Sequence, residues 1–133
     1  MDDSKLLANQ FIGAIAAGDL EAAFSLVAED AAMWVDTRLA PAGRYDKRSL
    51  RELLGKFVHA VNGVSKVQVS NVVDNGQYAQ LDTVWHLQLG GRSYVNKYHI
   101  AVIGRDGKIA AFVSSANMRR LQKWIAALAS PRD

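Results

Sequence analysis

Asp82 is the residue whose type and place in the sequence most clearly suggest chemistry. It stands inside residues 80–89, QLDTVWHLQL, a run that alternates in the manner of a β-strand, and aspartate is depleted from strand interiors. A carboxylate that a strand holds partly out of water has a raised pKa and can act as a general base. We therefore expect Asp82 to move a proton during a reaction.

The strand that follows offers Asp82 two alternative partners. The two strands are joined by the glycine pair at residues 90–91. If the turn contains two residues, Asp82 lies opposite His99, and the two side chains can form an acid–base pair. If the hairpin contains a three-residue loop or a bulge, Asp82 lies opposite Tyr98 instead, with Asn96 on the same face.

The direction in which Asp82 points also has two interpretations. Simple alternation puts the apolar residues of its strand in the core and Asp82 outside. Alternatively, Asp82 faces the interior, and a partner subunit covers the apolar residues that then point outward. The two alternating sets are Leu81, Thr83, Trp85, Leu87 and Leu89 on one face and Gln80, Asp82, Val84, His86 and Gln88 on the other.

Several kinds of reactive site are excluded by the composition. The chain has no cysteine, which excludes a disulfide framework, a thiol nucleophile and a thiolate metal site. The three histidines and the acidic residues show no metal-ligand spacing, and no glycine-rich phosphate loop or G-x-S-x-G elbow is present. We expect neither a metal ion nor a cofactor.

Charge and hydropathy place the chain among ordinary globular proteins. The net charge is +3, and six basic residues lie between positions 38 and 56. Because this excess is small and no aromatic residue is interleaved with it, we expect a solvated helix face rather than a nucleic-acid site.

MDDSKLL at the N-terminus has no apolar core of a secretory signal, and no apolar run approaches the ~18 residues of a membrane span. We therefore expect a cytoplasmic, soluble protein.

Helices are predicted in the first half of the chain. Apolar residues recur at helical spacing through residues 4–17. Gly18 ends this helix, and Asp19 is a suitable N-cap for a short second one. A third helix is predicted to begin after the N-cap Asp46 and to end at the Asn-Gly pair of residues 62–63.

Strands are predicted at residues 32–36 and throughout the second half of the chain. Residues 32–36 are a short strand candidate, and residues 37–45, which contain a proline and a glycine, are predicted as a loop. Turn residues that tolerate a positive φ separate four further runs and favour an antiparallel meander. These predicted strands are residues 64–73, 78–89, 93–104 and 108–114. A C-terminal helix is predicted from Met118, Leu121, Ile125 and Leu128.

The elements together predict a single α+β domain over residues 1–133. Long antiparallel strands twist and curl strongly, so we expect a cone-shaped, curved antiparallel sheet. Three N-terminal helices close a pocket on its concave side, and the C-terminal helix is added to this unit. Side chains of the domain need not fill such a hollow, and hollows of this kind bind small molecules.

Two segments resemble a known group of proteins. FIGAIAAGDLEAAFSLVAEDAAMW at 11–34 and GRSYVNKYHIAVIGRDGKI at 91–109 resemble the nuclear-transport-factor-2-like superfamily, which includes the SnoaL-like, ketosteroid-isomerase and limonene-epoxide-hydrolase groups. The resemblance extends over nearly the whole chain. It implies the fold described above and a cofactor-free isomerase, cyclase or hydrolase, or else a protein without a reaction.

The resemblance to ketosteroid isomerases places Phe11, Val35 and His99 at the positions of their catalytic residues. Phe11 replaces a tyrosine and has no hydroxyl with which to stabilise an enolate. Val35 replaces the carboxylate base. We therefore do not expect the ketosteroid-isomerase mechanism.

The resemblance to limonene-epoxide hydrolases is limited to one residue type. The matching positions are Met33, Val35, Gln80, Asp82 and Asn117, of which Asp82 alone keeps its type, so hydrolysis by that route is not expected. The same resemblance implies that Asp82 faces the hollow, and it favours the hairpin with an extra residue, which puts Tyr98 and Asn96 inside. Asn117 takes the place of an acid–base aspartate of SnoaL-type cyclases and cannot titrate.

The leading hypothesis is a cofactor-independent enzyme of isomerase, cyclase, lyase or hydratase type that acts on a hydrophobic, ring-containing substrate. Asp82 is its general acid or base, with Tyr98 and His99 as catalytic partners. The expected substrate-binding residues are Met33, Val35, Phe57, Gln80, Val84, His86, Asn96 and Asn117. The alternative is a non-catalytic binding module for an apolar ligand, or a dimeric accessory protein. Since an inward Asp82 turns Trp85 and Leu87 outward, we also expect a homodimer through the convex face.

Overall fold

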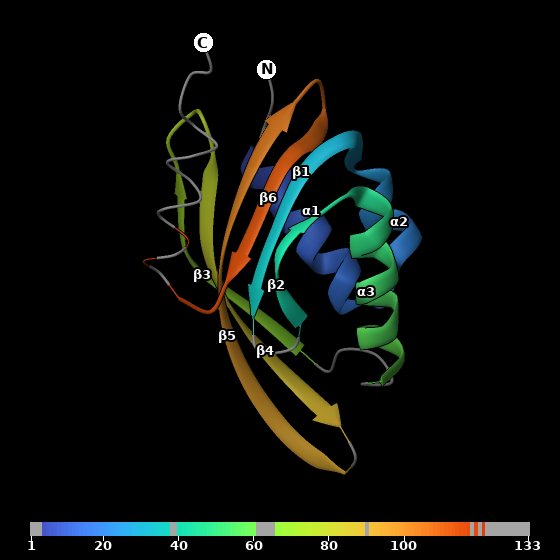
Figure 1. Ribbon diagram of the computed structural model, residues 1–133. Coiled ribbons are helices and arrows are strands. Elements are labelled where there is room, and N and C mark those ends of the chain that lie inside the picture. The colour runs from blue at the N-terminus through green and yellow to red at the C-terminus, as the bar shows by residue number, and fades with distance from the viewer. Residues whose placement is uncertain are drawn as a thin grey trace.

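Three helices pack against one side of a curved six-stranded sheet (Figure 1). The computed structural model describes residues 4–37, 40–60, 66–89, 91–117, 119 and 121. The strands lie in the order β2-β1-β6-β5-β4-β3. The elements are α1 (Ser4–Ala16), α2 (Leu20–Ser25), β1 (Val27–Thr37), β2 (Ala40–Tyr45), α3 (Lys47–Ala60), β3 (Lys66–Asp74), β4 (Ala79–Leu89), β5 (Arg92–Arg105) and β6 (Lys108–Ser115). The predicted α+β class is confirmed.

The helix boundaries follow the predicted capping residues. Gly18, two residues after the end of α1, takes a positive φ of 77°, a conformation that glycine adopts without steric cost. The Asp19 carboxylate accepts a hydrogen bond from the Ala22 amide at 3.0 Å, and the Asp46 carboxylate accepts one from the Ser49 amide at 2.7 Å. Both N-caps are therefore confirmed, whereas the predicted end of the third helix at residues 62–63 lies outside the described residues.

The antiparallel meander is also confirmed, and its central hairpin has the two-residue turn. Strands β3, β4, β5 and β6 pair in sequence. Leu89 pairs with Arg92 across residues 90–91, and the same register puts Asp82 opposite His99. The alternative favoured by the family resemblance, with Asp82 opposite Tyr98, is wrong because the hairpin contains no extra residue.

The first half of the sheet differs from the prediction. The segment predicted as a loop forms β2, which pairs antiparallel with β1, and β1 itself is longer than expected. Pro41 is compatible with β2 because this strand lies at the edge of the sheet, where one side of the backbone needs no partner. The sheet is also mixed rather than antiparallel, since β1 runs parallel to β6. Strand β6 is thereby central and almost entirely buried, as is usual for strands in parallel pairs.

The sheet has two faces with different contents, and we call the face toward the helices the inner face and the opposite one the outer face. Leu81, Trp85 and Leu87 of β4 are buried in one core cluster with residues of α1, α2 and α3. The alternating residues of β4 to which these three belong therefore face inward, and the residues between them, which include Asp82, face outward. Simple alternation predicted this correctly, and the expectation that Asp82 faces the hollow is wrong.

The concave side is filled over much of its extent by large side chains. Those that are essentially inaccessible to solvent include Phe11, Phe24, Met33 and Leu50. The ring of Phe11 contacts that of Phe24 with a centroid distance of 5.6 Å and that of Phe112 with one of 5.2 Å. This aromatic contact ties α1 and α2 to the middle of the sheet.

A smaller apolar cluster lies on the outer face. Ala101 and Val113 are buried there together with Leu121, and Trp34 and Tyr78 pack against them. Apart from Arg119 and Leu121, the predicted C-terminal helix, with Met118, Ile125 and Leu128, lies outside the described residues. Within the part of the chain that is described, no helix is both long and apolar enough to cross a membrane.

The assignment of the two faces can be tested on β5. Ile100 faces inward and is 1% exposed, whereas Lys97 faces outward opposite Val84 and is exposed. We expect Ile100→Ala to lower the free energy of unfolding by about 2–5 kcal/mol because it leaves a cavity in the core. Lys97→Arg, which keeps the charge, should change it by no more than about 0.5 kcal/mol. Urea denaturation followed by circular dichroism measures both values, and equal losses would contradict the assignment.

Candidate acid–base site

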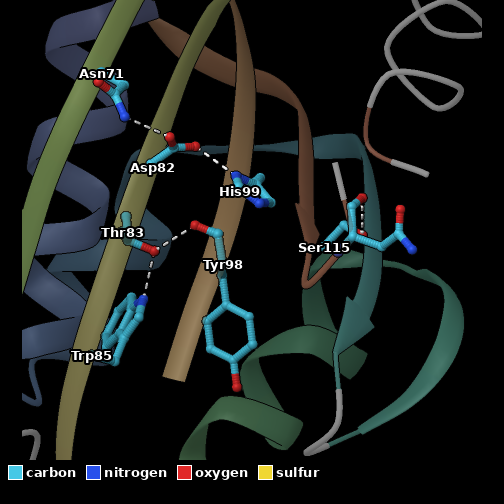
Figure 2. A network of polar contacts seen from close by, with 8 residues as sticks. Asn71, Asp82, Thr83, Trp85, Tyr98, His99 and Ser115 are labelled. Carbon is cyan, nitrogen blue, oxygen red and sulfur yellow. Dashed lines mark hydrogen bonds and ion pairs between the residues drawn. The ribbon is translucent and has the colours of Figure 1, made fainter. Parts of the chain in front are cut away.

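Five strands each contribute one polar side chain to a continuous line across the outer face. We call this line the outer row, and it consists of Asn71, Asp82, His99, Ser115 and Asp36, from β3, β4, β5, β6 and β1. Asp82 pairs with His99, His99 with Ser115, and Ser115 with Asp36 in the strand registers. Directly opposed residues share a face of a sheet, so the registers bring Asp82, His99, Ser115 and Asp36 to one face. Figure 2 shows Asn71, Asp82, His99 and Ser115 of this row.

The centre of the outer row is a short contact between Asp82 and His99. The distance from His99 Nδ1 to Asp82 Oδ1 is 2.6 Å, and the two side chains are 25% and 26% exposed. The second carboxylate oxygen, Oδ2, accepts a hydrogen bond from Asn71 Nδ2 at 2.9 Å. So short a bond between an imidazole and a carboxylate is typical of a charge-assisted hydrogen bond.

The surroundings keep Asp82 ionised. Burial is the largest influence on its pKa and raises it, but the hydrogen bonds from His99 and Asn71, together with the charge of His99, outweigh burial, so the pKa of Asp82 is lowered. The sequence-based expectation of a raised pKa is therefore wrong. An ionised carboxylate can only accept hydrogen bonds, so Nδ1 of His99 must carry a proton. In the neutral imidazole Nε2 then holds the basic lone pair.

The other end of the row is structural. The buried Ser115 hydroxyl donates to the Asn117 carbonyl at 3.0 Å and accepts from the Asn117 amide at 3.1 Å, and it lies 3.4 Å from Asp36 Oδ2. The Ala116 amide donates to the Asp36 carbonyl at 2.9 Å, and the Asn117 side chain accepts from the Arg119 amide at 2.9 Å. These contacts fasten the end of β6 to β1, so Ser115 and Asn117 form a turn rather than a nucleophilic site.

The sheet divides the predicted site residues into two groups. Gln80, Val84, His86 and His99 share the outer face with Asp82, whereas Met33, Val35, Phe57, Asn96 and Tyr98 belong to the inner face. Asp82 and Tyr98 therefore do not meet. His86 Nε2 lies 3.0 Å from Gln68 Oε1 on the neighbouring strand, so the two outward histidines have different partners.

The inner face has a polar network of its own. Trp85 Nε1 donates to Thr83 Oγ1 at 2.8 Å, and Thr83 Oγ1 donates to the Tyr98 carbonyl at 3.0 Å (Figure 2). This network holds the indole of Trp85 in one orientation. Among the described residues, every carboxylate except those of Asp36 and Asp82 is exposed, and these two lie on the outer face. As far as the chain is described, the inner face therefore offers uncharged hydrogen-bonding groups but no buried carboxylate.

Sequence reasoning missed four members of these networks: Asn71, Asp36, Ser115 and Thr83. The sequence did contain a signal for Thr83, because a hydroxyl residue interrupts the otherwise apolar set of β4. For Asn71 it contained none, since its position depends on an irregularity of β3. In the described part of the chain, no group of three or more His, Cys, Asp or Glu side chains is placed to hold a metal ion.

Solved structures with the same fold include two proposed polyketide cyclases. Wild-type IdmH of Streptomyces antibioticus, a proposed polyketide cyclase, superposes with a TM-score of 0.74 at 17% sequence identity and covers 84% of this chain and 90% of its own. A proposed polyketide cyclase of Xanthomonas campestris has a TM-score of 0.66 at 22% identity, with 95% and 96% covered. A Catenulispora acidiphila protein with a ketosteroid-isomerase-like fold, in complex with trimethylamine, has a TM-score of 0.70 at 10% identity, with 87% and 88% covered.

These similarities establish the fold. Comparison of the sequence with protein-family models and with curated proteins gives no match. At such low identities the superpositions show a common architecture and carry no residue roles across. The expected resemblance is confirmed at this level.

The lowered pKa of Asp82 has a consequence for stability. A carboxylate with a depressed pKa in the folded state stabilises that state above its unfolded pKa, and this contribution is lost as the pH falls through the folded value. We expect Asp82→Asn to destabilise the protein near pH 7, with a smaller difference from the parent protein below about pH 4. Urea denaturation at both pH values measures this. The exposed turn variant Asp106→Asn should differ little from the parent at either pH, and an Asp82→Asn penalty that is independent of pH would contradict the interpretation.

Proposed function

We propose that this chain, which has the nuclear-transport-factor-2-like fold, is a cofactor-independent acid–base enzyme for a hydrophobic, ring-containing small molecule. His99 is the proton carrier, and Asp82 is the anion that orients it. The observation that carries the proposal is the 2.6 Å contact between two side chains that are each about a quarter exposed. This partial burial strengthens the interaction between the two side chains and still leaves them accessible to a substrate.

The proposed chemistry needs only this pair. Neutral His99 accepts at Nε2 a proton from a carbon next to a carbonyl group, and the bonding electrons move to the carbonyl oxygen to form an enolate. Asp82 stabilises the imidazolium that results. Return of the proton to a different carbon gives an isomer. If the enolate carbon instead attacks a second carbonyl, a ring closes, and the proton returns to the new alkoxide.

An apolar substrate fits the surroundings of the pair. Ala101 lies two residues from His99 on β5 and so shares the outer face, where the cluster of Ala101 and Val113 with Trp34 and Tyr78 lies. Ala101 and Val113 are themselves buried, so the partly buried rings of Trp34 and Tyr78 are the part of this cluster that a substrate can contact. Aromatic side chains of this kind favour a flat hydrocarbon ring over a sugar or a phosphate. The names of the two proposed cyclases of similar fold support this class of substrate.

A second candidate function is supported by the inner face. Trp85, held by Thr83, and the ring of Tyr98 pack with Phe57 and Met33 in the main core cluster. A carrier for an apolar ligand needs an apolar surface with uncharged hydrogen-bond donors, and it does not need a general base. In this case the Asp82–His99 pair would be purely structural.

One panel of variants distinguishes the two functions. In heavy water, cyclic ketones and aromatic β-ketoacyl compounds should exchange hydrogen for deuterium next to the carbonyl when the parent protein is added. His99→Gln and Asp82→Asn should each slow this exchange by about a hundredfold or more. Mass spectrometry measures the deuterium incorporated into each compound, whatever product is formed. His86→Gln is the matched control on the same face and should retain the activity.

The opposite pattern would favour the carrier. If no compound exchanges, and a compound of the panel raises the melting temperature of the parent protein and of Asp82→Asn alike, the inner face is the site. Tyr98→Phe should then reduce that stabilisation. Equal exchange by the parent and by His99→Gln would rule out the proposed acid–base role.

We further propose that the protein forms a homodimer through the outer face, with the substrate bound between the two subunits beside the Asp82–His99 pair. The sequence-based reason for a dimer was that Trp85 and Leu87 would point outward. This reason is wrong, because both residues are buried on the inner face. A different observation supports it: Val73 and Val95 face outward and are 57% and 58% exposed. Apolar side chains exposed on the outer face of a sheet favour association.

Sedimentation velocity at micromolar concentration tests this interface. The parent protein should sediment as a dimer, and a Val73→Lys/Val95→Lys double variant should sediment as a monomer, since it places charges in the apolar contact. Val69→Lys is the control, because Val69 is also exposed but faces inward, opposite Thr83. A monomeric parent protein, or a dimer that survives the double substitution, would contradict the proposal.

A further inference from the structure

Strand β3 contains an irregularity next to the Asp82–His99 pair. Ser70 pairs with Asp82 and Val73 pairs with Gln80. Two residues of β3, at positions 71 and 72, therefore lie opposite the single residue Leu81 of β4. One extra residue on one strand of an antiparallel pair is a β-bulge, and bulges commonly redirect a side chain beside a functional site.

The extra residue has an unusual backbone conformation. Asn71 has a φ of 51°, a left-handed value that is uncommon for residues other than glycine and that asparagine tolerates better than most. In a regular strand, residue 71 would point to the face opposite that of Ser70. With the bulge, Val72 packs against the inner core, and Asn71 turns outward to donate its hydrogen bond to Asp82 (Figure 2).

The bulge gives Asp82 a second anchor. Oδ1 is bound to His99 on β5 at 2.6 Å, and Oδ2 is bound to Asn71 on β3 at 2.9 Å. The terminal torsion of an aspartate has a broad, roughly two-fold distribution, so one hydrogen bond alone leaves the carboxylate plane able to rotate. Bonds to strands on opposite sides of β4 fix that plane.

We propose that Asn71 is a positioning residue that holds the Asp82 carboxylate turned toward His99 and so keeps the neutral imidazole in the form protonated at Nδ1. This form presents Nε2 as the base. The role in turnover rests on the proposed acid–base function, whereas the effect on the imidazole does not. Asn71 itself contacts no reacting atom and acts only through Asp82.

The tautomer of His99 can be measured without a substrate. Nitrogen-15 chemical shifts, recorded at a pH at which the imidazoles are neutral, distinguish protonation at Nδ1 from protonation at Nε2. In the parent protein we expect His99 to be protonated mainly at Nδ1. Asn71→Gly, which retains a residue suited to a positive φ but removes the amide, should lose this preference and show a substantial population protonated at Nε2.

Two further variants make the test specific. Asn71→Asp keeps the size and much of the backbone tolerance of asparagine, and in its ionised form it cannot donate, so it should shift the His99 tautomer as well. Ser70→Ala changes the residue that pairs directly with Asp82 and leaves the amide in place, so it should retain the parent tautomer. Melting temperatures identify any variant that fails to fold, and because glycine suits the left-handed conformation, Asn71→Gly should fold.

The outcomes separate the positioning role from the enzyme function. An unchanged His99 tautomer in folded Asn71→Gly overturns the positioning role, even if Asp82→Asn abolishes deuterium exchange. A shifted tautomer in Asn71→Gly supports that role, even if no compound of the panel exchanges and the enzyme function is rejected. A shift of the same size in Ser70→Ala would also overturn it, since any change in β3 would then have the same effect.

Discussion

The register of the hairpin between β4 and β5 is the constraint on which the rest of the structure depends. Side chains alternate with a period of two, so a slip by one residue would transfer every side chain of one strand to the other face. With Leu89 opposite Arg92, the register puts Asp82 beside His99 and leaves Tyr98 on the inner face. The same register buries Leu81 and Trp85 under the helices. One turn therefore determines both the core and the polar pair.

Much of the fold could be predicted because its signals are local. Asp19 and Asp46 cap helices through contacts three residues away, and the turn residues that separate the meander strands are contiguous in the sequence. The edge strand β2 was missed because its proline and glycine are typical of loops, and only its place at the edge of the sheet makes the proline acceptable. The parallel pairing of β1 with β6 is non-local and has no sequence signature.

The candidate site was predictable in its centre but not in its environment. Asp82 was recognisable as a charged residue within a strand, and His99 was one of its two possible partners. The direction of the Asp82 pKa shift was predicted wrongly. Burial, which raises the pKa, can be anticipated from a strand position, whereas the hydrogen bonds that lower the pKa come from residues on two other strands. Asn71 depends on a bulge that shifts register by one residue, and nothing in the letters SNVVD marks such a shift.

The pairing of β1 with β6 also affects how the chain reaches this structure. Asp36 and Ser115 meet across 79 residues of sequence, so closing the sheet at its centre carries a large loop-closure entropy. The helices and β1 cannot complete their packing until β6, the last described strand, pairs with β1. Folding is therefore expected to be completed late and to be slow for a chain of this length, since long-range parallel pairs form after local hairpins.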